Sequence, residues 1–114
     1  MVPRPSPPLD GPAIHATLRS YAAAYSALDV SAVRRVFPSV NEQALRRAFA
    51  GLRSQQVAIQ GEELVVNGET ATVSCTLVTV AVGQVGAATP RQDSRRVTFT
   101  LARRDGAWII VGRR

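Results

Sequence analysis

Residues 55–77 read QQVAIQGEELVVNGETATVSCTL, and this stretch decides the fold of the 114-residue chain. Apolar residues recur there at every second position, which is typical of a strand with one buried face. Two apolar pairs alternate with opposite parity, namely Val57 and Ile59, then Leu64 and Val66. A β-bulge near Gly61 would bring both pairs onto one face of a sheet. We therefore predict a bulged strand here.

Two glycine-containing dipeptides predict hairpins that extend this strand into a sheet. Asn67-Gly68 and Asp105-Gly106 both favour the left-handed backbone that tight hairpin turns require. The expected partners are Val66 with Ala71 and Leu64 with Val73 at the first turn, and Arg103 with Trp108 and Leu101 with Ile110 at the second. Strands over residues 71–82 and 97–101 then complete an antiparallel meander of four strands.

Upstream of residue 55 the apolar spacing changes to the three-and-four spacing of helices. The clearest helix is expected between a cap at Asp10 and Leu28, with Pro12 in its first turn. One apolar stripe follows that helix, formed by Ile14, Leu18, Tyr21, Tyr25 and Leu28. We expect this stripe to pack on the sheet, because that arrangement buries both apolar patterns together.

Two shorter helices are predicted between the first helix and the sheet. Asp29 or Ser31 can cap the second helix, and Pro38 ends it. The third helix is expected over residues 40–52, after a capping box formed by Ser39 and Glu42. Three helices followed by four strands predict an α+β domain, with the N-terminal helices packed on a four-stranded antiparallel sheet.

The N-terminal segment differs in composition from the rest of the chain. Residues 1–12 contain five of the seven prolines, and each proline fixes φ and removes a backbone donor. We predict a stiff linker over residues 1–12 that joins a domain at 13–114 to a longer protein. No signal peptide or membrane-spanning run is visible, so the cytoplasm is the default expectation. A membrane-anchored parent protein would instead place the domain outside the membrane.

All 14 basic residues of the chain are arginines. With eight acidic residues, they give a net charge of +6. Such a balance favours anionic partners. The arginines are scattered in pairs, however, and the few aromatic residues occupy core-type positions rather than an exposed stacking platform. We therefore do not expect nucleic-acid binding, and an arginine-driven binder of another anionic partner is kept as a third hypothesis.

The order and spacing of these elements resemble the nuclear transport factor 2-like (NTF2-like) superfamily, also called SnoaL-like or cystatin-like. The resemblance covers about residues 12–112 and is carried by residues 14–29, 33–40, 65–73, 97–101 and 105–110. It implies a curved sheet wrapped on a long helix, a cone-shaped pocket and frequent dimerisation through the sheet. The chain looks most similar to small bacterial domains that follow Pro-rich linkers, including some at the C-terminus of membrane-anchored protein kinases.

The resemblance also implies where catalytic acids would lie. Isomerase-type members carry one carboxylate on the first strand and a second acid on a later strand, matched here by residues 97–101. Neither position holds an acid, and a single histidine, His15, leaves no His–Asp pair. Cys75 is expected to be a buried apolar residue, and no nucleotide-binding or metal-binding motif is found in the sequence. We assign no catalytic residue, metal or cofactor.

The ligand-pocket candidates are aromatic residues of the expected core, namely Tyr21, Tyr25, Phe99 and Trp108. The leading hypothesis is a non-catalytic module that binds a small apolar ligand or associates as a homodimer. The dimer would form through the outward sheet face, which carries Val78 and Thr98. The alternative is a small pocket enzyme, an isomerase or hydrolase of the ketosteroid-isomerase type, that uses Tyr21 or Tyr25 with Asp29.

Overall fold

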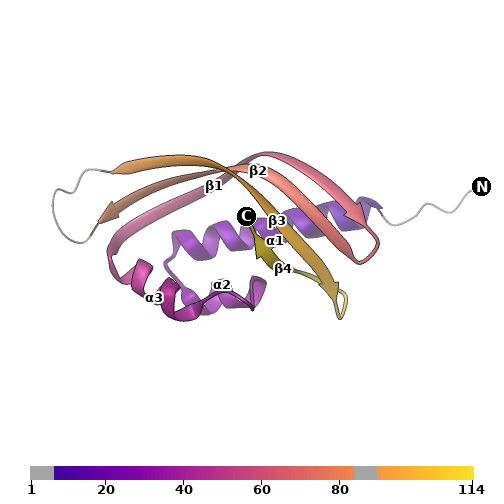
Figure 1. The fold of residues 1–114 in the computed structure, drawn as a ribbon, viewed down its shortest axis with the longest axis horizontal. Helices are drawn as coiled ribbons and strands as arrows, with labels where there is room; N and C mark the ends of the chain where they lie inside the picture. The colour runs from indigo at the N-terminus through magenta and orange to yellow at the C-terminus, as the bar shows by residue number, and fades with distance from the viewer. Residues whose placement is uncertain (1–6, 84–89) are drawn as a thin grey trace, which may run out of the picture.

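Three helices precede a four-stranded sheet in the computed structural model, which describes residues 7–83 and 90–114. The helices are α1 (Pro7–Ser26), α2 (Val30–Val36) and α3 (Glu42–Ala50), and the strands are β1 (Leu52–Asn67), β2 (Thr70–Gly83), β3 (Arg91–Arg104) and β4 (Ala107–Arg113). The strands are antiparallel and lie in the order β1-β2-β3-β4. The sheet arches over the three described helices, which all lie on its concave side (Figure 1). The predicted α+β architecture is confirmed.

Both predicted hairpins form with the predicted partners. The structure contains the pairs Val66–Ala71 and Leu64–Val73 between β1 and β2, and Arg103–Trp108 and Leu101–Ile110 between β3 and β4. Gly68 and Gly106 have φ angles of 66° and 79°. Glycine adopts such positive φ angles without steric cost, so the two turns can be tight. The register of these two hairpins was therefore readable from their turns.

The predicted bulge in β1 is also present. The pairing of β1 with β2 shifts register between Gln60 and Glu63, and Gly61 between them has a φ of 63°. The extra residue restores the alternation of apolar side chains. Val57 and Leu64, on opposite sides of the bulge, consequently pack against the same core.

Helix α1 begins earlier than the sequence analysis predicts. It starts at Pro7, and Asp10 lies inside it instead of at its N-cap position. Two consecutive prolines occupy the first turn, where their fixed φ suits a helix and no N–H donor is needed. Pro12 lies farther inside the helix than predicted. The part of the expected linker over residues 1–6 lies outside the described residues, so it stays a prediction.

The end of α1 is a Schellman motif, which stops the helix before the predicted residue. Leu28 has a φ of 55°, and its N–H donates to the carbonyl of Tyr25 at 3.1 Å. The N–H of Asp29 donates to the carbonyl of Ala24 at 3.0 Å. These two bonds satisfy carbonyl groups that the helix end would otherwise leave unpaired, and α1 ends at Ser26.

Side chains cap the two shorter helices. The Asp29 carboxylate accepts a hydrogen bond from the N–H of Ala32 at 3.1 Å, which confirms one of the two predicted caps of α2. Asn41 caps α3, accepting from the N–H of Ala44 at 3.0 Å. The capping box predicted at Ser39 is therefore wrong, because asparagine is an equally good cap and stands directly before the first helical residue.

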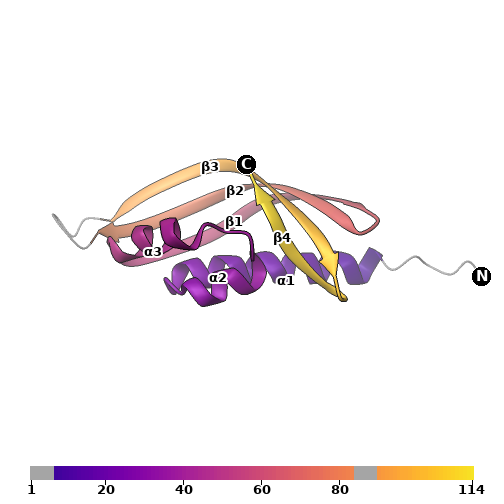
Figure 2. The same ribbon diagram turned by 60° about the horizontal axis from the view of Figure 1, so that its bottom comes forward.

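Two apolar clusters fill the space between the helices and the sheet. The larger lies between α1 and the sheet and has as its largest fully buried side chains Tyr21, Phe99, Ile14, Leu18, Leu101 and Ile110. The smaller joins α1, α2 and α3, which lie beside one another in Figure 2, through Ala24, Val33, Leu45 and Phe49. Tyr25 packs against both clusters.

Among the described residues, no helix combines the length and apolarity needed to cross a membrane.

Candidate ligand-binding site

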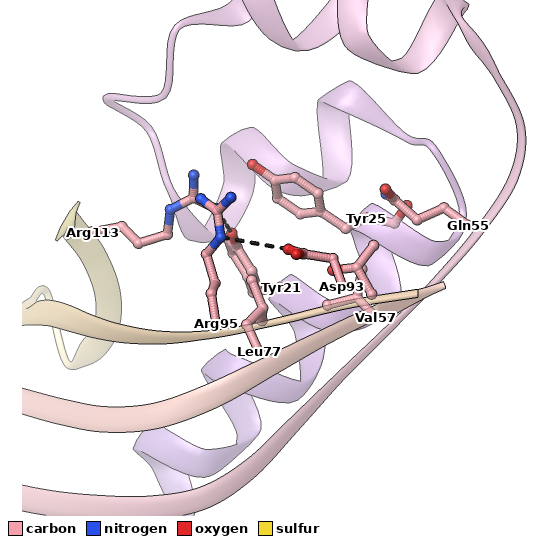
Figure 3. A pocket seen from close by; sticks show the side chains of 9 residues that line it. Tyr21, Tyr25, Gln55, Val57, Leu77, Asp93, Arg95 and Arg113 are labelled. Carbon is pink, nitrogen blue, oxygen red and sulfur yellow. Dashed lines mark hydrogen bonds and ion pairs between the residues drawn. The ribbon is translucent and has the colours of Figure 1, made fainter. Parts of the chain in front are cut away.

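A hollow of about 220 Å³ lies between α1 and the concave face of the sheet. Residues from α1 and from each of the four strands line it: Tyr21, Tyr25, Gln55, Val57, Leu77, Thr79, Asp93, Arg95 and Arg113. Figure 3 shows these side chains converging from the helix and the strands. Tyr21 and Leu77 also belong to the larger apolar cluster, so the core forms the floor of the hollow.

The polar side of the hollow comes from the register of β2 and β3. Leu77 pairs with Arg95 and Thr79 pairs with Asp93, so these side chains share one face. On β3 the inward-facing residue Val97 is 4% exposed. The next two inward-facing residues, Arg95 and Asp93, are charged, and their side chains are 65% and 66% exposed. The hollow therefore begins where the apolar lining of the concave face ends.

Strand β4 contributes Arg113 because of a second bulge. The register between β3 and β4 shifts by one residue beyond Leu101, which leaves Val111 as an extra residue. Arg113 consequently pairs with Phe99 and shares its inward direction. Without the bulge, strict alternation from the buried Ile110 would turn Arg113 to the outer face.

Arg113 is held in place by a buried phenol. Its Nη1 atom donates a hydrogen bond to the Tyr21 hydroxyl oxygen at 2.7 Å. Burial raises the pKa of Tyr21 above its ordinary value, and the neighbouring Tyr25 adds to the rise. The Arg113 guanidinium lowers this pKa without cancelling the effect of burial. Tyr21 therefore stays neutral and serves as a fixed hydrogen-bond acceptor for Arg113.

The Tyr25 ring forms one wall of the hollow. Its centroid lies 4.5 Å from that of Tyr21. Nε2 of Gln55 donates to the backbone carbonyl of Tyr25 at 2.9 Å, and the N–H of Val57 donates to Oγ of Ser26 at 2.9 Å. These two bonds tie β1 to the end of α1, so the walls that they join are fixed relative to each other.

A loose ion pair lies at the rim of the hollow. Nε of Arg95 is 3.6 Å from Oδ2 of Asp93, as the dashed line in Figure 3 marks. Exposed pairs of this kind contribute about 0–1 kcal/mol, because water already solvates both charges well. The pair can therefore open for a ligand at little cost in free energy.

The four aromatic candidates fall into two groups. Tyr21 and Tyr25 line the hollow. The Phe99 ring meets that of Tyr21 edge-on with centroids 5.0 Å apart, and Trp108 is buried in the core with the Arg103 guanidinium 5.5 Å from its ring centroid. Neither Phe99 nor Trp108 is among the described residues that line the hollow. A ligand contact by either tyrosine stays a prediction.

The expectation that the later strand carries no acid is wrong. That strand begins at Arg91 rather than at residue 97, so it includes Asp93, which lines the hollow. Arg95 and Arg113 also line the hollow, and neither was predicted as a site residue from the sequence. The signal for β3 was available, since the inward parity of Val97 continues backward through residues 95 and 93. The residues at those two positions are charged, so apolar alternation did not predict this part of the strand.

The remaining candidates lie elsewhere. Asp29 is an exposed helix cap, so it cannot assist the tyrosines as the enzyme hypothesis requires. Nδ1 of His15 is 2.5 Å from Oε1 of Glu62, a contact between α1 and β1. Cys75 is buried, and burial raises the pKa of its thiol. Within residues 7–83 and 90–114, no group of three or more histidine, cysteine or acidic side chains could hold a metal ion.

Comparisons with solved structures identify the fold. A scan against protein-family models and a search of the curated proteins gave no match. A provisionally assigned dehydratase of the NTF2-like family from Streptomyces avermitilis has a TM-score of 0.82 at 13% identity, covering 95% of each chain. A provisionally assigned aromatic ring hydroxylase from Novosphingobium aromaticivorans has a TM-score of 0.79 at 19% identity, covering 96% of this chain and 89% of that chain.

An uncharacterised protein with a cystatin-like fold from Caulobacter vibrioides is also similar, with a TM-score of 0.71 at 18% identity, covering 90% of this chain and 85% of that chain. These likenesses extend over nearly the whole domain, and at such identities they establish the fold alone. The chain has the NTF2-like, cystatin-like α+β fold, as the sequence resemblance implied.

Proposed function

We propose that this chain is a non-catalytic module that binds a small molecule in the hollow between α1 and the sheet. The preformed hollow carries the proposal, because it joins an apolar wall at Val57 and Leu77 to polar groups from several strands. Small-molecule sites typically combine an apolar lining with a few well-placed polar groups. Pockets for drug-sized ligands measure roughly 300–1,000 Å³, so a hollow of about 220 Å³ suits a smaller ligand.

The titratable groups favour binding over proton transfer. Asp93 is the one carboxylate among the described lining residues, and its side chain is 66% exposed. General acid–base catalysis works best when the environment brings the pKa of the catalytic group near the working pH. Burial moves the pKa of Tyr21 away from neutrality, which suits a hydrogen-bonding role.

A variant that fills the hollow tests the proposal. We expect Thr79→Trp to abolish binding of small aromatic probes in a ligand-observed NMR screen, because the indole would occupy the hollow. Gln92→Trp is the control, since Gln92 is exposed on the neighbouring strand and does not line the hollow. Equal probe binding by Thr79→Trp and the wild-type chain would contradict the proposal.

One observation favours a second candidate function. The Asp93 carboxylate lines the same hollow as Tyr21 and Tyr25, and carboxylates and tyrosines are both among the side chains that act as general acids or bases in enzymes. On this candidate Asp93 replaces Asp29 as the acid. Turnover of ketosteroid- or epoxide-type substrates that Asp93→Asn abolishes, with substrate binding retained, would support an enzyme and overturn the non-catalytic proposal.

We also propose that the chain associates as a homodimer through its outer sheet face. The described helices all lie on the concave side (Figures 1 and 2), and the uncovered face carries the half-buried Val78, Val80 and Thr98. Two-fold dimers, in which the same face of each copy meets, are the commonest assemblies of identical chains. Sedimentation should give a dimer for the wild-type chain and a folded monomer for Val78→Arg or Thr98→Glu. Dimeric variants would rule out this interface.

A further inference from the structure

The hollow between α1 and the sheet carries more positive than negative charge. Two guanidinium groups, from Arg95 and Arg113, line it together with one carboxylate, from Asp93. The carboxylate pairs only loosely with Arg95, at 3.6 Å. Among the described residues Arg113 has no carboxylate partner, and its hydrogen bond goes to the neutral hydroxyl of Tyr21. One full positive charge at this site is therefore not neutralised.

The fold itself directs this charge inward. An arginine on an open surface is solvated by water and needs no partner, but the bulge at Val111 turns Arg113 toward the concave face. The buried hydroxyl of Tyr21 then fixes one guanidinium nitrogen, Nη1. The side chain remains exposed, so its other N–H groups can reach an incoming ligand. Arg113 is thus oriented before any ligand arrives.

The floor and one wall of the hollow are apolar. This apolar lining is formed by Val57 and Leu77 together with the ring of Tyr25, which packs against the rings of Tyr21 and Phe49. A ligand that satisfies both sides needs a small apolar body and an anionic head. Guanidinium groups bind carboxylates through paired N–H···O bonds, which gives this head group a geometric advantage over a neutral acceptor.

We infer that the ligand is a small organic monocarboxylate, with its head bound by Arg113 and Arg95 and its apolar body against Val57 and Leu77. This inference rests on the proposed binding function and adds the chemical class of the ligand. Asp93 competes with the ligand for Arg95 and repels its carboxylate. The site therefore suits one negative charge better than two.

Benzoate and its neutral isostere benzamide are suitable probes, because they share one shape and differ in charge. We expect isothermal titration of the full chain to show benzoate binding at least tenfold more tightly than benzamide. Arg113→Gln should weaken benzoate binding at least tenfold and leave benzamide binding nearly unchanged. Arg96→Gln is the matched control, since Arg96 belongs to the same strand as Arg95 but contacts Glu63 outside the hollow.

Asp93→Asn gives a test of opposite sign. It removes the competing charge and frees Arg95, so we expect benzoate to bind several-fold more tightly. A site in which Asp93 accepts a hydrogen bond from its ligand would instead lose affinity, and that result would overturn the inference. Circular dichroism confirms that each variant is folded. Arg95→Gln replaces Arg113→Gln if the latter does not fold, with the same expected direction.

The two proposals fail in different ways. If benzamide binds as tightly as benzoate in a manner that Thr79→Trp abolishes, the carboxylate inference is wrong and the binding function stands. If no charged or neutral aromatic probe binds, both are wrong. Benzoate binding that is unaffected by Arg113→Gln and Arg95→Gln would also overturn the inference, because the carboxylate would then be bound elsewhere.

Discussion

The two halves of the concave sheet face are built from the same strands, yet one half is closed and the other is open. In the closed half, Val73, Phe99 and Ile110 are fully buried beneath α1. In the open half, the same alternation presents Thr79, Asp93 and the neighbouring charged positions to a hollow. Strand geometry is continuous across the boundary, and only the residue types change.

The difference separates two tasks that a single sheet performs. The pleat decides which residues point inward, and it does so equally in both halves. Side-chain chemistry then decides whether an inward residue is sealed from water or kept at a hydrated surface, because burying a charge without a partner is costly. Stability should therefore depend on the closed half and ligand recognition on the open half.

The strongest test of this division compares two positions on β3 that face the same way. Phe99→Ala should lower the free energy of unfolding by about 3–5 kcal/mol, through lost burial and the cavity left behind. Arg95→Ala should change it by about 0.5 kcal/mol or less, since the side chain is mainly exposed. Urea unfolding measures both, and losses of similar size would show that the open half is packed like the core.

The next largest change in unfolding free energy is expected at the bulge that brings Val57 and Leu64 onto the same core. Gly61→Ala should cost about 1–2 kcal/mol, because alanine is strained in the left-handed region where Gly61 lies. Gly51→Ala is the control, since Gly51 has an ordinary φ of −82° and an added Cβ would lie 3.7 Å from the carbonyl oxygen of Ala48. Equal losses of unfolding free energy would mean that the φ of Gly61 is not limiting.

A smaller loss of unfolding free energy is expected from removing the N-cap of α3. Asn41→Ala should destabilise the chain by about 1 kcal/mol, because the first turn of α3 loses its capping hydrogen bond. Ser39→Ala should be nearly neutral in the same thermal unfolding experiment, since Asn41 is the residue that caps α3. The reverse ranking would restore the capping box that the sequence favoured.

The smallest change in unfolding free energy at neutral pH is expected for Tyr21→Phe, at the boundary between the two halves. The folded-state pKa of Tyr21 lies above the ordinary value of 10.0, so the unfolded chain loses this proton first as the pH rises. The stabilisation is present below about pH 10 and is lost above it. Tyr21→Phe should remove this loss in unfolding experiments between pH 8 and pH 11. An unchanged alkaline slope in the variant would contradict the raised pKa.

The closed half could be predicted from the sequence almost completely. Its residues are apolar, so alternation at Phe99 and Leu101 and the turn at Gly106 together fixed the strands and their partners. The helix ends were less certain, because Ser39 and Asn41 are similar caps and the sequence alone does not rank them. Prolines that resemble a linker in composition also proved compatible with the first turn of α1.

The open half was harder to predict because its signals do not depend on apolarity. Arg95 and Asp93 continue the inward parity of β3, but charged residues resemble a loop when a strand is sought by hydrophobic alternation. Strict alternation turns Arg113 outward, and the bulge that turns it inward lies at Val111. Gly112, directly after Val111, is the signal that could have indicated this bulge. Tyr21 and Tyr25 were identified because they also belong to the apolar stripe of α1.

The bulge in β4 also bears on what a change of register in this strand would do to the concave face. If β4 lost the bulge and paired regularly, Arg113 would face outward and Arg114 would face inward, since neighbouring residues of a strand alternate. Consecutive arginines at these two positions mean that either register delivers a guanidinium group to the concave face. A one-residue slip in the pairing of β4 would therefore still leave a guanidinium group on the concave face.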